Sequence, residues 1–276
     1  MQLRHSTNPA QIRTFDTAAL RANYLVDDLF VDDEIRATYT HEDRIVLGGA
    51  RPVTAPLTLG SFDELRTETF FENREAGIVN VGGTGTVSVD GTAYVLATGS
   101  CLYIGRGVVD VVFTSTAPAA PASFYLFSAT AHTAYPTTLV EAGQGTVREL
   151  GDPTTSNERT INQYIHANGV QSCQVVMGVT VLSTGSMWNT MPAHTHDRRT
   201  ECYLYFDLDA DQRVIHLMGE PTESRHLVVA NNEAIISPSW SLHSGFGTGS
   251  YSFVWAMAGE NKAFDDMDHV LPAALL

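Results

Sequence analysis

The chain has 276 residues, of which 43% are hydrophobic and 17% charged, as expected for a folded protein that forms one large domain or two domains of about 140 residues. Its formal net charge of −15 and the lack of a Lys/Arg cluster argue against the basic face that nucleic-acid binding requires. The sequence contains no run of about 18 apolar residues and no apolar stretch near its start, so neither a membrane span nor a secretory signal is predicted.

The predicted elements begin with one short helix and continue almost entirely as β-strands. The helix is expected over residues 18–25, with Asp16 or Thr17 as its N-cap. Asp90-Gly91 is predicted to turn a hairpin, because this dipeptide accepts the positive φ of a tight turn. Clear strand patterns follow over residues 78–81, 85–89, 93–96, 108–113, 124–127, 174–182, 201–208, 214–218, 227–229, 234–236 and 251–257. Many short strands separated by turn residues predict an all-β fold of jelly-roll barrel type.

A polar, glycine-rich stretch over residues 141–162 separates two halves of similar strand content. We therefore predict two β-domains in tandem, residues 1–145 and residues 146–276. A weak internal repeat supports this division, because Glu75 and Glu201 each open a strand of their half.

The strongest chemical motif lies in the second half and combines three histidines with a carboxylate. His194 and His196 are two residues apart, so their side chains leave a strand on the same face, about 6.6 Å apart. A turn before Glu201 would bring its carboxylate to the same interior, and His243 follows the turn at Pro238. These four residues are candidate metal ligands, and a nitrogen-rich set favours zinc, iron, nickel or manganese over calcium or magnesium.

The first half offers no comparable set of imidazoles. Matched on Glu75, the two paired histidine positions become Glu68 and Phe70, and the later histidine position becomes Asp110. We therefore predict that the first domain lacks a metal and packs, dimerises or walls the active site.

The cysteines and the single lysine limit the chemistry further. Cys101, Cys173 and Cys202 are odd in number and far apart, which argues against disulfides and favours a reducing cytoplasm. Lys262 is the only lysine beside fifteen arginines, so a Schiff-base mechanism is nearly excluded.

Several segments together resemble the 5-keto-4-deoxyuronate isomerase family, whose members contain two cupin barrels. The resemblance implies that all four candidate ligands bind metal, with one zinc ion per chain, and that the chain forms a homo-hexamer. The family usually has arginine where Asn73 and Glu158 stand, so any substrate contact made by those arginines is altered here. The resemblance spans nearly the whole chain and is carried by residues 44–49, 73–83, 131–136, 155–162, 188–201, 236–245 and 259–269.

The implied activity belongs to the breakdown of pectin-type polyuronides. It is a ketol-isomerisation of 5-dehydro-4-deoxy-D-glucuronate to 3-deoxy-D-glycero-2,5-hexodiulosonate. A metal with an open position would polarise the carbonyl while another group moves the proton. Asp197, His226, Asp266 and His269 are eligible as that group, and the sequence does not choose among them.

Two residues are predicted to bind this small-molecule substrate. Arg198 is expected to grip the uronate carboxylate through a bidentate pair, with Arg199 as the alternative. Tyr205 shares the Glu201 face of its strand together with Tyr203, so its phenol is expected to line the pocket.

Three other functions stay open on the sequence alone. The first is 5-deoxy-glucuronate isomerase of inositol breakdown, which an assay on both sugars would separate from the first choice. The second is a cupin dioxygenase, which would contain iron and consume oxygen. The third is a sugar-binding or storage protein with a closed structural metal.

Overall fold

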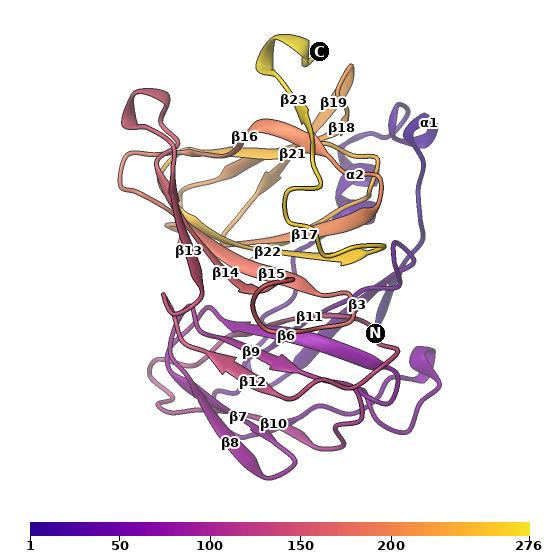
Figure 1. Ribbon diagram of the computed structural model, residues 1–276, viewed down its shortest axis with the longest axis vertical. Coiled ribbons are helices and arrows are strands. Elements are labelled where there is room, and N and C mark those ends of the chain that lie inside the picture. Colours follow the sequence, from indigo (N-terminus) through magenta and orange to yellow (C-terminus); the bar gives the residue numbers. More distant parts are fainter.

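The computed structural model describes residues 1–276 and contains two β-barrels stacked on each other (Figure 1). Each barrel combines a seven-stranded sheet with a smaller sheet, of four strands in the first barrel and five in the second. Helices are few and short, and none of them has the length and apolar character needed to cross a bilayer. The prediction of an all-β chain with two tandem barrels is confirmed.

The first barrel is formed by strands from the N-terminal half. Its seven-stranded sheet contains, in spatial order, β1 (Gln2–Arg4), β3 (Ile35–Thr40), β4 (Val46–Ala50), β11 (Phe124–Thr130), β6 (Arg74–Asn80), β9 (Cys101–Ile104) and β12 (Thr138–Val140). Its smaller sheet contains β5 (Leu57–Thr58), β10 (Val111–Ser115), β7 (Gly85–Val89) and β8 (Thr92–Leu96). The predicted hairpin joins β7 to β8, with φ angles of 46° at Asp90 and 80° at Gly91.

The second barrel is formed by the C-terminal half together with one strand from the start of the chain. Its seven-stranded sheet contains β13 (Thr146–Leu150), β14 (Arg159–Ile165), β15 (Val176–Leu182), β22 (Ser252–Gly259), β17 (Arg199–Phe206), β20 (Ala234–Ser237) and β2 (Leu25–Val26). Its smaller sheet contains β19 (Glu223–Val229), β18 (Val214–Glu220), β21 (His243–Gly247), β16 (Trp188–Thr195) and β23 (Asp268–Val270).

The N-terminal segment departs from the predicted division at residue 145. Two helices, α1 (Pro9–Ile12) and α2 (Thr17–Tyr24), precede β2 and pack on the second barrel, where Ile12 and Tyr24 join the apolar core. The predicted cap is present, because Asp16 accepts a hydrogen bond from the amide of Ala19. Only β1 of this segment pairs within the first barrel, so residues 9–26 belong structurally with residues 146–276.

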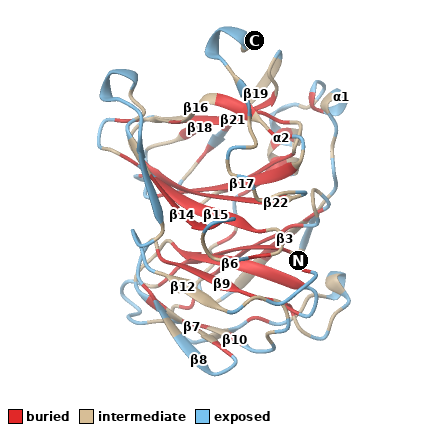
Figure 2. Cartoon of the chain, in the orientation of Figure 1, coloured by how far each residue is buried: buried red, intermediate tan, exposed pale blue.

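The two seven-stranded sheets pack face to face and bury a core shared by both barrels (Figure 2). Tyr103 and Phe127 enter it from the first barrel, and Cys202 and Leu204 enter it from the second. Alternation along β17 therefore sends Glu201 and Tyr203 into the interior of the second barrel. Cys202 faces away from Glu201, as the two-residue period of a strand requires.

The internal repeat aligns one residue away from the position predicted on Glu75. β6 and β17 occupy the same place in their sheets, and Ala76 pairs with β9 as Glu201 pairs with β20. Glu75 instead faces the shared core, on the opposite side of its strand from Ala76. The predicted match of Glu75 with Glu201 is wrong, because a shift of one residue exchanges the two faces of a strand.

Glu75 connects the two barrels through its buried carboxylate. Its Oε1 accepts from the amides of Gln174 and Val175 at 2.7 and 2.9 Å. Its Oε2 accepts from the amide of Cys173 and the hydroxyl of Tyr103, both at 2.7 Å. One carboxylate of the first barrel thus accepts hydrogen bonds from three amides of the second barrel, at the entry to β15, and from a phenol of its own barrel.

Candidate functional site

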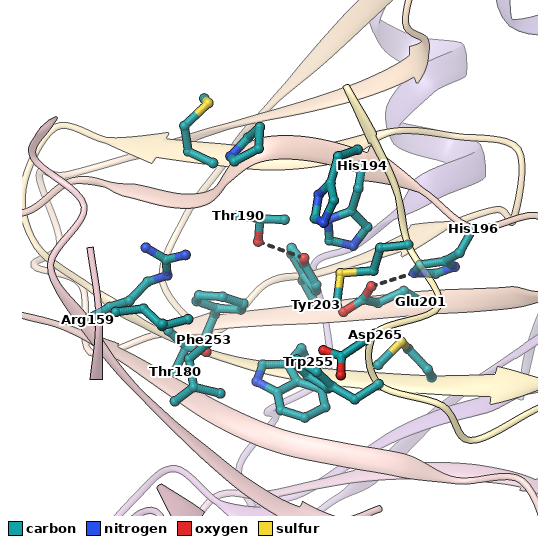
Figure 3. Close-up of a pocket in the computed structure, with 18 of the residues that line it drawn as sticks. Arg159, Thr180, Thr190, His194, His196, Glu201, Tyr203, Phe253, Trp255 and Asp265 are labelled. Carbon is teal, nitrogen blue, oxygen red and sulfur yellow. Dashed lines mark hydrogen bonds and ion pairs between the residues drawn. The ribbon is translucent and has the colours of Figure 1, made fainter. Parts of the chain in front are cut away.

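The four candidate ligands meet in the interior of the second barrel, and Figure 3 shows three of them, His194, His196 and Glu201. β16 carries His194 and ends just before His196, while β17 carries Glu201 as its third residue and β21 begins at His243. All four are buried, and their ligand atoms lie within 4.8 Å of one another. The cluster therefore joins two strands of the five-stranded sheet to the middle of the seven-stranded sheet.

Hydrogen bonds at the imidazoles identify the atoms that face the centre of this cluster. His196 Nδ1 donates to the carbonyl oxygen of Arg199 at 2.9 Å, which leaves Nε2 of His196 as an acceptor. That Nε2 nevertheless lies 2.9 Å from Glu201 Oε2. His243 Nε2 lies 2.9 Å from the same oxygen and 2.8 Å from His194 Nε2. Nitrogen and carboxylate oxygen atoms that converge in this way can share a cation, so the donor set fits a metal ion.

Three contacts among these atoms are shorter than the spacing around a tetrahedral ion, and the full set lies within 4.8 Å. Ligand atoms placed about 2.0–2.1 Å from zinc lie about 3.3 Å from one another. The observed contacts of 2.8–2.9 Å would need to open by only about 0.5 Å to admit the ion. The site could therefore bind a metal without a change of fold.

Burial and neighbouring charges favour the deprotonated ligands that a metal requires. Burial lowers the pKa of His194 to about 2, with further repulsion from His243. Burial also lowers the pKa of His243. For Glu201, burial raises the pKa, but attraction to His243 and the hydrogen bond with His196 outweigh it and hold the pKa well below its usual value. Neutral imidazoles beside an ionised carboxylate are ready for ligation.

A cavity of about 280 Å³ opens beside the cluster, near the lower end of the size range of small-molecule sites. Tyr203, Phe253 and Trp255 supply its aromatic wall, and Figure 3 shows His194, His196 and Glu201 on one side of the space that these rings line. The hydroxyl of Tyr203 lies 3.0 Å from Oγ1 of Thr190, so a polar pair interrupts this wall.

The two residues predicted to bind substrate lie outside this lining. Arg198 forms a bidentate ion pair with Asp266, with contacts of 2.7 and 2.8 Å, and reaches Asp268 at 3.2 Å. Tyr205 is buried deeper in the barrel, where its hydroxyl lies 2.8 Å from Nδ1 of His216. Either side chain would have to move to touch a molecule in the cavity, whereas the alternatives Arg199 and Tyr203 line it.

Of the four residues eligible to move the proton, the structure brings one to the cavity. His269 on β23 lines it, and its ring centroid lies 5.9 Å from that of His194. Asp266 is engaged by Arg198, and Asp197 and His226 are exposed and lie outside the lining.

The KduI/IolB family model matches residues 26–271 of the chain. The chain belongs to this family. It is similar to proteins named 4-deoxy-L-threo-5-hexosulose-uronate ketol-isomerase from Kineococcus radiotolerans (64% identical over 100% of both chains), Bacillus pumilus (56%, over 98% of both) and Dickeya dadantii (48%, over 98% of both). The predicted family resemblance is confirmed over the full length.

Solved structures confirm the tandem cupin architecture of this KduI/IolB family member. An IolB-like protein from Salmonella typhimurium has a TM-score of 0.68 at 14% identity, covering 90% of this chain and 97% of that chain. An oxalate decarboxylase has a TM-score of 0.56 at 10% identity, covering 90% and 79% of the two chains. At these identities the likeness concerns the fold alone.

The structure adds lining residues that sequence reasoning missed. Arg148 on β13 and Arg159 on β14 face the cavity, and Phe264 and Asp265 reach it from the loop before β23. An alternating pattern along residues 159–165 would have placed Arg159 on the same face as Ile161. Nothing local in the sequence indicates that this face lines the same cavity as the histidines.

Proposed function

We propose that this protein is a zinc-dependent ketol-isomerase that converts 5-dehydro-4-deoxy-D-glucuronate to 3-deoxy-D-glycero-2,5-hexodiulosonate. The proposal rests on the buried set of three imidazoles and one carboxylate beside a cavity, in a chain whose full-length relatives are named 4-deoxy-L-threo-5-hexosulose-uronate ketol-isomerase. The reaction moves hydrogen from C2 to C1, so that the C1 aldehyde becomes an alcohol and the C2 alcohol becomes a ketone. One carbon is reduced as its neighbour is oxidised, and no redox partner is needed.

The residues around the cavity divide the work of this reaction. The four clustered residues would hold the ion, and zinc bound there would supply Lewis acidity toward the substrate oxygens. Tyr203 presents a hydroxyl to the cavity and, with Thr190 beside it, is placed to hydrogen-bond a substrate oxygen. The aromatic wall excludes water, which strengthens each of these polar contacts.

Zinc is our choice of metal because of the chemistry of the donor set. Three imidazole nitrogens and one carboxylate oxygen suit zinc, which needs no redox change to polarise a carbonyl. Iron, nickel and manganese accept similar ligands, so metal analysis has to precede the assignment.

The proposal extends to the cellular setting of the enzyme. We place it in the breakdown of pectin-type polyuronides, acting on a small uronate in the cytoplasm, on the basis of the proposed substrate and of three free cysteines. We also propose a homo-hexamer, following the family resemblance, which light scattering of the purified protein would test.

The first experiment combines metal analysis with an isomerase assay on freshly prepared substrate. The purified protein should contain about one zinc per chain, lose activity on chelation and regain it with zinc. His196→Ala should lose both zinc and turnover, because it removes a ligand whose other nitrogen is held by the Arg199 carbonyl. His226→Ala is the matched control, since this exposed histidine lies outside the cavity, and it should keep both.

Other outcomes would change the assignment in defined ways. A fully active metal-free enzyme would contradict the role of the cluster. Turnover of 5-deoxy-glucuronate in preference to the proposed substrate would identify the other isomerase. Iron content together with oxygen consumption would identify a dioxygenase.

A further inference from the structure

Three arginines line the cavity, and two of them are engaged by the protein itself. Arg199 is fully buried and donates to the carbonyl oxygens of Ala263 and Asp266 at 2.8 Å. Arg148 lies 3.7 Å from the carboxylate of Asp265 and also covers an aromatic ring of the same loop. Their charges therefore help to hold the loop before β23 against the cavity.

Arg159 differs from both because most of its guanidinium is unpaired. Its Nη1 donates to the carbonyl oxygen of Asn157 at 2.8 Å, whereas Nε and Nη2 have no partner in the protein. No carboxylate forms an ion pair with it. Burial lowers its pKa, and only the phenols of Tyr203 and Tyr251 act in the other direction. A partly dehydrated cation with free donors is suited to bind an anion.

The position of Arg159 in the sheet sets it apart from the metal cluster. β14 and β17 belong to the same sheet, with β15 and β22 between them. Arg159 and Glu201 therefore enter the barrel interior from strands that lie apart in that sheet. Figure 3 shows the guanidinium of Arg159 across the cavity from His194 and Glu201, with Tyr203 and Phe253 between them. A molecule that touches both the cluster and Arg159 must span the cavity.

We propose that Arg159 binds the C6 carboxylate of the substrate and thereby determines which end of the molecule reaches the metal cluster. This inference rests on the proposed function. The substrate carries its aldehyde at C1 and its carboxylate at C6, so the two ends match the two ends of the cavity. The anchor also prevents reversed binding, in which the C5 ketone and the adjacent carboxylate would occupy the cluster in place of the reacting carbons. Arg159 thus selects acids over neutral sugars and sets the orientation of the substrate's carbon chain in the cavity.

The test compares the natural acid with its C6 methyl ester in the zinc-loaded enzyme. The unmodified protein should prefer the acid, and Arg159→Met should lower kcat/KM for the acid about 100-fold, since a charged pair of hydrogen bonds is lost. Most of that loss should appear in KM. The ester should be affected little, so that the variant treats acid and ester alike. Arg159→Lys keeps the positive charge but lacks the paired donors of a guanidinium, so its kcat/KM for the acid should lie between those of the unmodified protein and Arg159→Met.

Binding and metal content make the result independent of turnover. Calorimetric titration of each protein with the acid product and its ester should show the same loss of discrimination, and the zinc content should stay unchanged. Arg36→Met, on the first barrel and paired only with Glu34, is the control arginine and should behave as the unmodified protein. If Arg159→Met keeps its preference for the acid, the inference is overturned while the isomerase proposal stands. If the unmodified protein binds acid over ester but does not isomerise it, the isomerase proposal fails while Arg159 keeps its role as an anion anchor.

Discussion

Removal of the Glu75 carboxylate should loosen the contact between the two barrels. The carboxylate is fully buried and accepts four hydrogen bonds of 2.7 to 2.9 Å. A hydrogen bond to a charged group contributes about 1.5–3 kcal/mol, and a buried donor left without a partner costs about 1–3 kcal/mol. Glu75→Ala strands three amides, two of which are only partly buried and regain water. We therefore expect a loss of about 3–5 kcal/mol in the free energy of unfolding.

Two milder variants separate the charge from the space that it fills. Glu75→Gln keeps the shape but turns an amide NH2 toward the Cys173 amide or the Tyr103 hydroxyl, so a loss of about 1–3 kcal/mol is expected. Tyr103→Phe removes one donor from a carboxylate that keeps three, and should cost about 1 kcal/mol. Urea unfolding at one fixed protein concentration gives all three values. A Glu75→Gln protein within about 0.5 kcal/mol of the unmodified protein would refute the assigned role.

Further predictions concern the thiols and the loop before β23. A thiol reagent should modify only Cys173 in the folded protein, and it should modify all three cysteines after denaturation. The reason is that burial raises the pKa of Cys101 and Cys202 and blocks access to both thiols. Fast reaction of more than one thiol in the folded protein would contradict this. Arg198→Ala should raise amide hydrogen exchange in the loop while global unfolding stays nearly unchanged, because a partly exposed ion pair adds little to global stability; unchanged exchange would mean that the pair does not hold the loop. The hydrogen bond from Arg198 lowers the pKa of Asp266 to about 2, so this contact contributes fully above the unfolded carboxyl pKa of about 3.9 and is lost as pH falls toward 2. Loop protection factors, which are exchange rates corrected for the intrinsic pH dependence, should fall over that interval in the unmodified protein and stay flat in Arg198→Ala.

The features that the sequence predicted correctly depend on neighbours along the chain. The cap at Asp16 and the hairpin at Asp90-Gly91 are local turn chemistry. The two-residue period of a strand places His194 and His196 on one face and turns Cys202 away from Glu201. The pairing of β16 with β21 was not predicted, but the family pattern indicated that His243 would complete the cluster.

The features that were missed depend on which strands and loops become neighbours in space. From the sequence, Arg198 and Arg159 are equally plausible as anion ligands. In the structure, Asp266 of the loop before β23 forms an ion pair with Arg198, whereas no residue of that loop pairs with Arg159. The predicted alignment of Glu75 with Glu201 was wrong for a related reason. Both halves place a carboxylate near the start of the corresponding strand, and only the sheet register reveals that one faces the barrel interior and the other the partner barrel.

The placement of β2 has a consequence for how the chain is assembled. Val26 pairs with Ala234. One edge of the cavity-containing barrel is therefore closed by residues that are synthesised early, and this pairing can form only after the late-synthesised residues of β20 are available. Such a distant pairing forms slowly because a long loop has to close. A protein divided between the two barrels would leave β20 with an open edge, which is a template for association with other chains. The start of the chain thus covers this edge of β20, and the second barrel can close only after Val26 and Ala234 have both been synthesised.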